Sequence, residues 1–142
     1  RKVKAEIDPE KTIIIDAPPG TSCPVISSIK DTDFCVLVTE PTPFGLHDLK
    51  LAVEVVRKIN IPHGVVIKGA SLGDNETEEY CAAEKLPVLM RIPFDRRIAK
   101  AYAKGLPIIE AMPELKQYFH DMHDQIQRII REFNAKGKEH IS

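Results

Sequence analysis

The sequence lacks the features that mark several special classes of protein. No apolar run approaches the roughly 20 residues that a membrane-spanning helix needs, so we expect no stable membrane insertion. The 20 basic and 21 acidic residues leave a net charge of -1, which gives no general attraction to nucleic acid. Only three cysteines are present, and their odd number argues against a disulfide framework and for a reducing cytoplasm.

What is present is the composition of a globular domain. Of the 142 residues, 43% are hydrophobic and 29% are charged, which excludes disorder for the bulk of the chain. This length suits one domain with a sizeable core. We therefore expect a single domain over residues 1–142, whose tail frays over residues 135–142, where the apolar pattern is lost.

Four apolar runs predict strands. None of them alternates apolar with polar residues, which is typical of strands buried on both faces in a parallel sheet covered by helices. The runs cover residues 12–16, 34–38, 64–68 and 87–92.

The segments between these runs have helical patterns. Thr42 followed by Pro43 predicts one helix start, Asn75 with Glu78 resembles a capping box, and Asp95 predicts a third start. The last helix is expected from Pro113, with the clearest amphipathic stripe in the chain. Alternating strands and helices predict a three-layer α/β fold, with a mostly parallel sheet of about four strands and helices on both faces.

Candidate site residues follow the strands, because open α/β sheets bind ligands at the carboxyl ends of their strands. Asp16 comes directly after an apolar run, where a carboxylate needs a hydrogen bond, a partner or a cation. A Mg²⁺ ion held through water suits it, and Gly20 would let the backbone approach a phosphate closely. An equally weighted alternative is that Asp16 caps the following helix.

At this point the sequence resembles a known family. Asp16-Ala17-Pro18-Pro19-Gly20-Thr21, directly after the first apolar run, is similar to the second nucleotide-binding motif of MinD/ParA/Mrp-type P-loop ATPases. Residues 36–42 resemble the family's next strand and loop, and residues 92–95 resemble the loop beside its adenine pocket. The similarity extends over residues 12–133 and is greatest to the subgroup that carries an inserted ferredoxin domain.

The resemblance implies a fold, ligands and roles. It implies part of a P-loop NTPase fold that binds ATP with Mg²⁺, dimerises around two nucleotides and hydrolyses slowly as a switch. Asp16 would hold the water shell of Mg²⁺, and Gly20 would sense the γ-phosphate through its backbone N–H. The other residues assigned to nucleotide binding in this way are Pro19, Thr21, Lys68, Pro93 and Phe94.

Two departures from the family pattern are informative. The phosphate loop Gly-x-x-x-x-Gly-Lys-Ser/Thr is absent, so we expect a carboxyl-terminal half of the ATPase domain that does not hydrolyse ATP by itself. In the family the phosphate-loop strand separates the strands that correspond to residues 12–16 and 34–38, so these two are not expected to pair. Lys68 replaces an Asn that contacts adenine, and a lysine can only donate hydrogen bonds.

Cys23 is a candidate ligand for an iron–sulfur cluster. In the nitrogenase iron protein, a relative of this family, a cysteine at the same offset binds a [4Fe–4S] cluster between subunits, which implies an iron–sulfur or redox partner. A thiolate at a helix amino terminus has a lowered pKa, which suits metal ligation. The alternative is that Cys23 packs as a small residue on the sheet. Cys35 and Cys81 are expected to be packing residues.

Charged clusters elsewhere in the sequence have simpler interpretations. The final helix carries His120, Asp121, His123 and Asp124, for which a solvated face is favoured over a metal site. Arg96 and Arg97 follow Asp95, where contact with phosphate or a dimer partner competes with a solvated helix start. The main alternative for the whole chain is a noncatalytic α/β scaffold for docking or dimerisation that binds no nucleotide alone.

Overall fold

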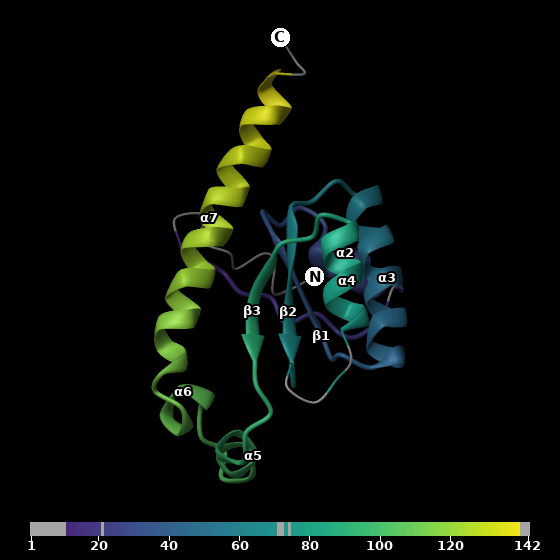
Figure 1. Ribbon diagram of the computed structural model, residues 1–142. Coiled ribbons are helices and arrows are strands. Elements are labelled where there is room, and N and C mark those ends of the chain that lie inside the picture. Colours follow the sequence, from purple (N-terminus) through teal and green to yellow (C-terminus); the bar gives the residue numbers. More distant parts are fainter. Residues whose placement is uncertain (1–10, 21, 71–72, 74, 140–142) are drawn as a thin grey trace.

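The computed structural model describes residues 11–20, 22–70, 73 and 75–139, and its centre is a parallel sheet of three strands (Figure 1). These are β1 (Cys35–Thr39), β2 (His63–Lys68) and β3 (Val88–Ile92), in the spatial order β1-β2-β3. Both pairings are parallel, with an irregularity between Val65 and Val66 on β2. The strands predicted from the last three apolar runs are therefore confirmed.

Helices cover both faces of this sheet and connect its strands (Figure 1). One core packs Leu49 and Val53 against Val65 and Ile67 of β2. The core on the other face surrounds Val66 and takes in the start of the last helix. The helices are α2 (Cys23–Ile29), α3 (Pro43–Lys58), α4 (Glu76–Ala83), α5 (Arg96–Ala103), α6 (Ile108–Ala111) and α7 (Leu115–Glu139). This is the predicted three-layer α/β arrangement.

Three helices end in the same way. Asn60, Lys85 and Gly105 follow α3, α4 and α5 with φ of 57°, 56° and 69°, the left-handed conformation of a helix C-terminal cap. The next residue in each case donates its N–H to a carbonyl five residues back, and a proline follows. These bonds join Ile61 to Val56 (3.1 Å), Leu86 to Cys81 (2.8 Å) and Leu106 to Ala101 (2.8 Å).

The strand expected over residues 12–16 is not formed, and this prediction is wrong. Residues 12–18 have no regular secondary structure, and the Ile14 side chain is 92% exposed. Within the described residues β1 pairs only with β2, so its outer edge is open and no ladder includes residues 12–16. Val38, on the face of the sheet that Val66 shares, is 65% exposed. An apolar run needs a partner strand to become a strand, whatever its propensity.

The predicted helix starts are mostly confirmed. Thr42 caps α3 by accepting a bond from the Gly45 N–H, and Asp95 caps α5. The capping box at α4 is wrong, because Asn75 makes no side-chain cap and Glu78 binds Arg91 instead. A short helix, α6, intervenes before α7. The fraying expected over residues 135–142 stays a prediction, although helix is assigned through residue 139.

Candidate functional site

The carboxyl ends of the three strands meet at one edge of the sheet, where the sequence predicts the ligand site. Lys68, the last residue of β2, is in register with Ile92, the last residue of β3. The backbone N–H groups of Gly69 and Ala70 both donate to the Ile92 carbonyl, at 2.7 and 3.2 Å. The loop after β2 is therefore fixed to the end of β3, which brings Lys68 close to the segment that begins at Pro93.

The loop between β1 and α3 is fixed just as firmly. The buried Thr39 hydroxyl donates to the Gly45 carbonyl at 3.0 Å, and the Gly45 N–H donates to the Thr42 hydroxyl at 3.0 Å. A Cβ atom at Gly45 would lie 2.2 Å from the Glu40 carbonyl oxygen, a distance that real Cβ atoms do not reach. The position therefore requires glycine.

A second glycine, Gly73, allows the loop between β2 and α4 to contact the loop between β1 and α3. A Cβ atom at Gly73, which precedes α4, would lie 2.2 Å from the Pro41 carbonyl oxygen. Neither Gly45 nor Gly73 is among the site residues predicted from the sequence. A glycine soon after a Thr-Pro helix start is the signal that could have identified Gly45, since glycine in a helix lowers stability unless the backbone needs it.

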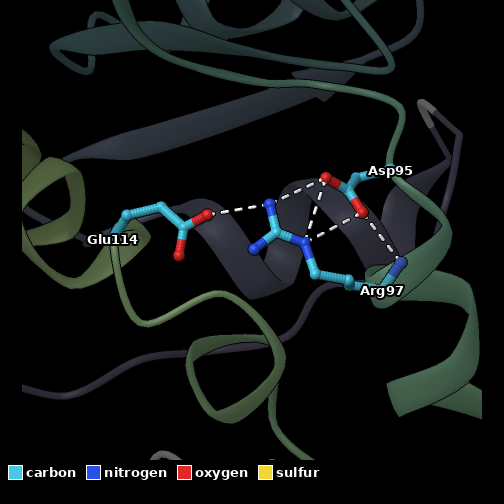
Figure 2. Close-up of polar contacts among 3 residues, drawn as sticks. All are labelled: Asp95, Arg97 and Glu114. Atoms are coloured by element: carbon cyan, nitrogen blue, oxygen red, sulfur yellow. Dashed lines mark hydrogen bonds and ion pairs between the residues drawn. The ribbon is translucent and has the colours of Figure 1, made fainter.

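Beside this edge the segment after β3 presents an exposed aromatic ring on an anchored backbone. Phe94 is 61% exposed, and the neighbouring Pro93 is half-buried. Asp95 accepts a bond from the Arg97 backbone N–H at 2.8 Å and two from its guanidinium Nε at 3.2 Å (Figure 2). The segment is thus held at Ile92 on one side and at Asp95 on the other.

Arg97 connects this segment to the start of α7. Its Nη2 lies 2.9 Å from Asp95 Oδ2 and 2.8 Å from Glu114 Oε1, so one guanidinium lies between two carboxylates (Figure 2). Hydrogen bonds from the Arg97 side chain, and then from its backbone, hold the pKa of Asp95 below its ordinary value. The same side-chain contact raises the pKa of Arg97. This arrangement favours the helix-start interpretation of Arg97 over a phosphate contact.

The segment predicted to bind phosphate and Mg²⁺ is open to solvent. Asp16, Pro19 and Gly20 are all exposed, and Thr21 lies outside the described residues. Gly20 has φ of 104°, and nothing lies within 4 Å of a Cβ built there. An exposed carboxylate and an accessible backbone N–H fit a hydrated Mg²⁺ ion and a phosphate oxygen. Among the described contacts, no ion pair joins Asp16 to Lys68.

Cys23 is the first residue of α2 and is exposed. In the part of the chain that the structure describes, no group of three or more Cys, His, Asp or Glu side chains could hold a metal ion. A [4Fe–4S] cluster takes four ligands, so Cys23 fits such a cluster only as one contributor among several chains or segments. Burial raises the pKa of the other two thiols, Cys35 and Cys81.

The polar cluster on α7 lies on the solvated side, as predicted. His120, Asp121, His123 and Asp124 are all exposed, and the Asp121 carboxylate accepts a bond from Gln117 at 2.8 Å. The apolar stripe of the same helix packs on the sheet. No helix within the described residues is long and apolar enough to cross a membrane.

Comparison with known proteins gives a family match and several relatives. Residues 5–131 match the ParA family model, described as NUBPL iron-transfer P-loop NTPase. An uncharacterised protein of Methanocaldococcus jannaschii is 33% identical over 113 residues, covering 80% of this chain and 38% of that protein. The iron-sulfur cluster carrier protein of Aquifex aeolicus is 30% identical over 117 residues, covering 72% and 32%. That of Pyrococcus horikoshii is 28% identical over 143 residues, covering 88% and 48%.

Solved structures agree on the fold. The cell division ATPase MinD of Pyrococcus furiosus superposes with a TM-score of 0.63 at 24% identity, over 80% of this chain and 50% of that one. MinD of Pyrococcus horikoshii, complexed with Mg-ADP, superposes with a TM-score of 0.61 at 24% identity, over 78% and 48%. This chain thus spans between about a third and a half of the proteins it matches.

Proposed function

Because this chain belongs to the ParA family of P-loop NTPases, we propose that it forms the switch and adenine side of a MinD/Mrp-type ATPase acting in iron–sulfur cluster transfer. The family membership confirms the resemblance drawn from residues 16–21, 36–42 and 92–95. The observation that carries the proposal is the fixed edge where β1, β2 and β3 end. Ligands of open α/β sheets bind at such an edge.

On the phosphate side, Asp16 and Gly20 have the proposed roles. The Asp16 carboxylate would hold the water shell of a Mg²⁺ ion, and the Gly20 N–H would sense the terminal phosphate, with Pro19 and Thr21 in the same loop. Mg-ATP supplies the phosphoryl group. The sequence contains no phosphate-loop lysine, so these groups provide only part of the charge that phosphoryl transfer requires.

On the base side, Phe94 and Lys68 are the proposed contacts. The exposed Phe94 ring offers a flat apolar surface for adenine, on a backbone that Ile92 and Asp95 anchor beside Pro93. The exposed Lys68 ammonium can donate to a ring nitrogen but accepts no bond from the adenine amino group. We therefore expect weak adenine binding that an asparagine at position 68 strengthens.

The test uses the purified 142-residue chain and the nonhydrolysable analogue Mg-AMP-PNP. We expect backbone amide shifts in NMR at Gly69, Ala70 and Phe94, no ATP turnover, weaker binding in Phe94→Ala and tighter binding in Lys68→Asn. The matched control is Tyr102→Ala, which removes an aromatic ring of 86% exposure from α5. Absence of shifts at millimolar nucleotide would support the noncatalytic scaffold, and Mg²⁺-dependent turnover abolished by Asp16→Ala would refute the expected inactivity.

For cluster transfer we propose that Cys23 supplies one thiolate to a cluster shared between two copies. It is the exposed thiol among the three free cysteines, all of which suit the reducing cytoplasm we propose as the location. After anaerobic incubation with iron, sulfide and a small thiol that can fill the two remaining ligand positions, we expect visible cluster absorbance and a dimer, both lost in Cys23→Ser. Cys35→Ser is the control, and equal cluster content in the two variants would leave Cys23 a packing role only.

The scaffold alternative has one observation in its favour. The outer edge of β1 is open among the described residues, and Val36 and Val38 beside it are 40% and 65% exposed. An open edge with exposed apolar side chains recruits another strand. Dimerisation without nucleotide, together with no adenine-dependent amide shift, would favour this alternative.

A further inference from the structure

The strongest unassigned feature is a groove at the opposite end of the sheet from the predicted nucleotide site. Two shallow hollows of about 540 and 310 Å³, both open to solvent, share Lys85, Leu86, Pro87 and Ile129, so they adjoin one another. One wall is made by the loops that end α3 and α4, and the other by the distal half of α7, including Phe133. We name it the helix-end groove.

The groove arises because α7 is longer than the sheet that it covers. Its 25 residues extend about 37 Å, whereas a strand of five or six residues extends about 20 Å. Beyond the sheet, α7 continues toward the C-terminus with no strand beneath it (Figure 1). Ile129 and Phe133 are only half-buried there, so the apolar stripe continues into the groove.

The loop wall is held together by hydrogen bonds and an ion pair within the chain. Both loops have the left-handed cap described above, and Arg57 ties them together through Glu84. The Arg57 guanidinium lies 2.7 Å from the Glu84 carboxylate and donates to the Glu84 backbone carbonyl at 3.0 Å. A preformed surface loses little conformational entropy when a partner binds.

Lys85 occupies a backbone position that normally favours glycine. Its φ is 56°, and helix C-terminal caps of this kind usually carry glycine or, as at Asn60, asparagine. Lys85 is exposed and lines both hollows. Within the described residues neither Lys85 nor Arg128 across the groove forms an ion pair. A strained residue that presents a free cation to a groove points to recognition.

We propose that the helix-end groove docks an amphipathic helix of a partner protein that carries acidic residues beside its apolar stripe. Leu86, Pro87 and Ile129 form the apolar floor, and this pattern suits a helix lying in a groove. Arg57, Lys85 and Arg128 line the groove against one carboxylate, Glu132, and Arg57 is already paired. Lys85 and Arg128 outnumber Glu132, and this excess of positive charge complements acidic side chains and disfavours basic ones.

The test uses fluorescence anisotropy with the 142-residue chain and a labelled helical peptide of about 16 residues, long enough to form a helix. The peptide has leucines at helical spacing with flanking glutamates, and its counterpart has lysine at every glutamate position. We expect the acidic peptide to bind, the basic one not to bind, and added salt to weaken binding. Lys85→Gly and Arg128→Gln should each weaken binding about fivefold, as expected for one exposed ion pair.

Stability measurements separate docking from a structural role of Lys85. Lys85→Gly should raise the urea midpoint, since glycine adopts this conformation freely, while binding falls. Lys104→Gly, which removes an exposed lysine at the end of α5 and away from both hollows, should leave binding unchanged. Unaltered binding in Lys85→Gly, or equal binding of both peptides, would overturn the proposal. Concentration-dependent dimerisation lost in Arg128→Gln, without peptide binding, would also overturn it and would assign the groove to a second copy.

Discussion

Gly45→Ala is the sharpest test of how the loop between β1 and α3 is built. In an ordinary helix this change stabilises by about 1 kcal/mol, because alanine has less backbone freedom to lose. Gly45 lies in the first turn of α3, yet its Cβ would lie 2.2 Å from the Glu40 carbonyl oxygen and 3.1 Å from the Thr42 hydroxyl oxygen. The nearest atom belongs to the backbone, so the helix itself must move.

The unfavourable effects exceed the favourable one. Overpacking of this kind costs about 1 to 3 kcal/mol. A shifted Gly45 carbonyl also loses the 3.0 Å bond from the buried Thr39 hydroxyl, which then keeps only the longer contact of 3.4 Å to the Glu40 carbonyl, at a cost of about 1 kcal/mol. After subtracting the gain in helix propensity, the free energy of unfolding should fall by about 2 kcal/mol. At about 3 °C per kcal/mol for this chain length, the melting temperature should fall by about 6 °C.

The assay is urea and thermal unfolding followed by circular dichroism, with Gly137→Ala as the matched control. Gly137 lies in α7 and nothing lies within 4 Å of a Cβ built there, so its substitution should stabilise by about 0.5 kcal/mol near the helix end. The two changes are chemically identical and should have opposite signs. A Gly45→Ala chain as stable as the parent would refute the close approach of Gly45 to Glu40.

Three further outcomes are expected. Thr77→Val should raise the free energy of unfolding by about 1 kcal/mol in urea, because the fully buried Thr77 hydroxyl has no hydrogen-bond partner among the described residues; lower stability would contradict this. Glu78→Gln should cost about 0.5 kcal/mol, since the carboxylate pairs with Arg91 while partly exposed. The hydrogen bond from Arg91 lowers the pKa of Glu78, so its contribution is complete above the ordinary pKa and is lost as pH falls through the lowered value; a difference from Glu78→Gln that persists in acid would be inconsistent. A thiol reagent should label the exposed Cys23 rapidly and the 1%-exposed Cys81 only on unfolding, and equal rates read by mass spectrometry would argue against the described core.

The fold class could be predicted because its signals are local. Runs without polar alternation indicated strands covered on both faces, and helical spacing indicated the helices between them. Helix starts were predicted correctly where one side chain accepts a hydrogen bond from a backbone N–H in the first turn, as at Thr42 and Asp95. They failed at α4, where Glu78 had a stronger partner in Arg91, 13 residues away in the sequence. A long-range ion pair is invisible in a local pattern.

The candidate site also has a part that local sequence predicts and a part that depends on contacts between distant segments. The sequence identified the strand ends, and with them Lys68, Pro93 and Phe94, because strand direction alone brings the carboxyl ends of parallel strands to one edge. It did not identify Gly45 or Gly73, since the need for glycine there comes from backbone atoms of other segments.

Residues 12–16 separate the features that follow from local sequence from those that depend on tertiary contacts. Their character as a run of β-branched residues before an aspartate is local, and the motif that follows them is enough to indicate the family. Whether the run became a strand depended on a neighbouring edge, and among the described residues no strand pairs with it. The β-propensity of a segment is set by its own residues, whereas a β-strand also needs a neighbouring strand to which it can hydrogen-bond. The helix-end groove was decided in the same way, by the length of α7 relative to the sheet beneath it.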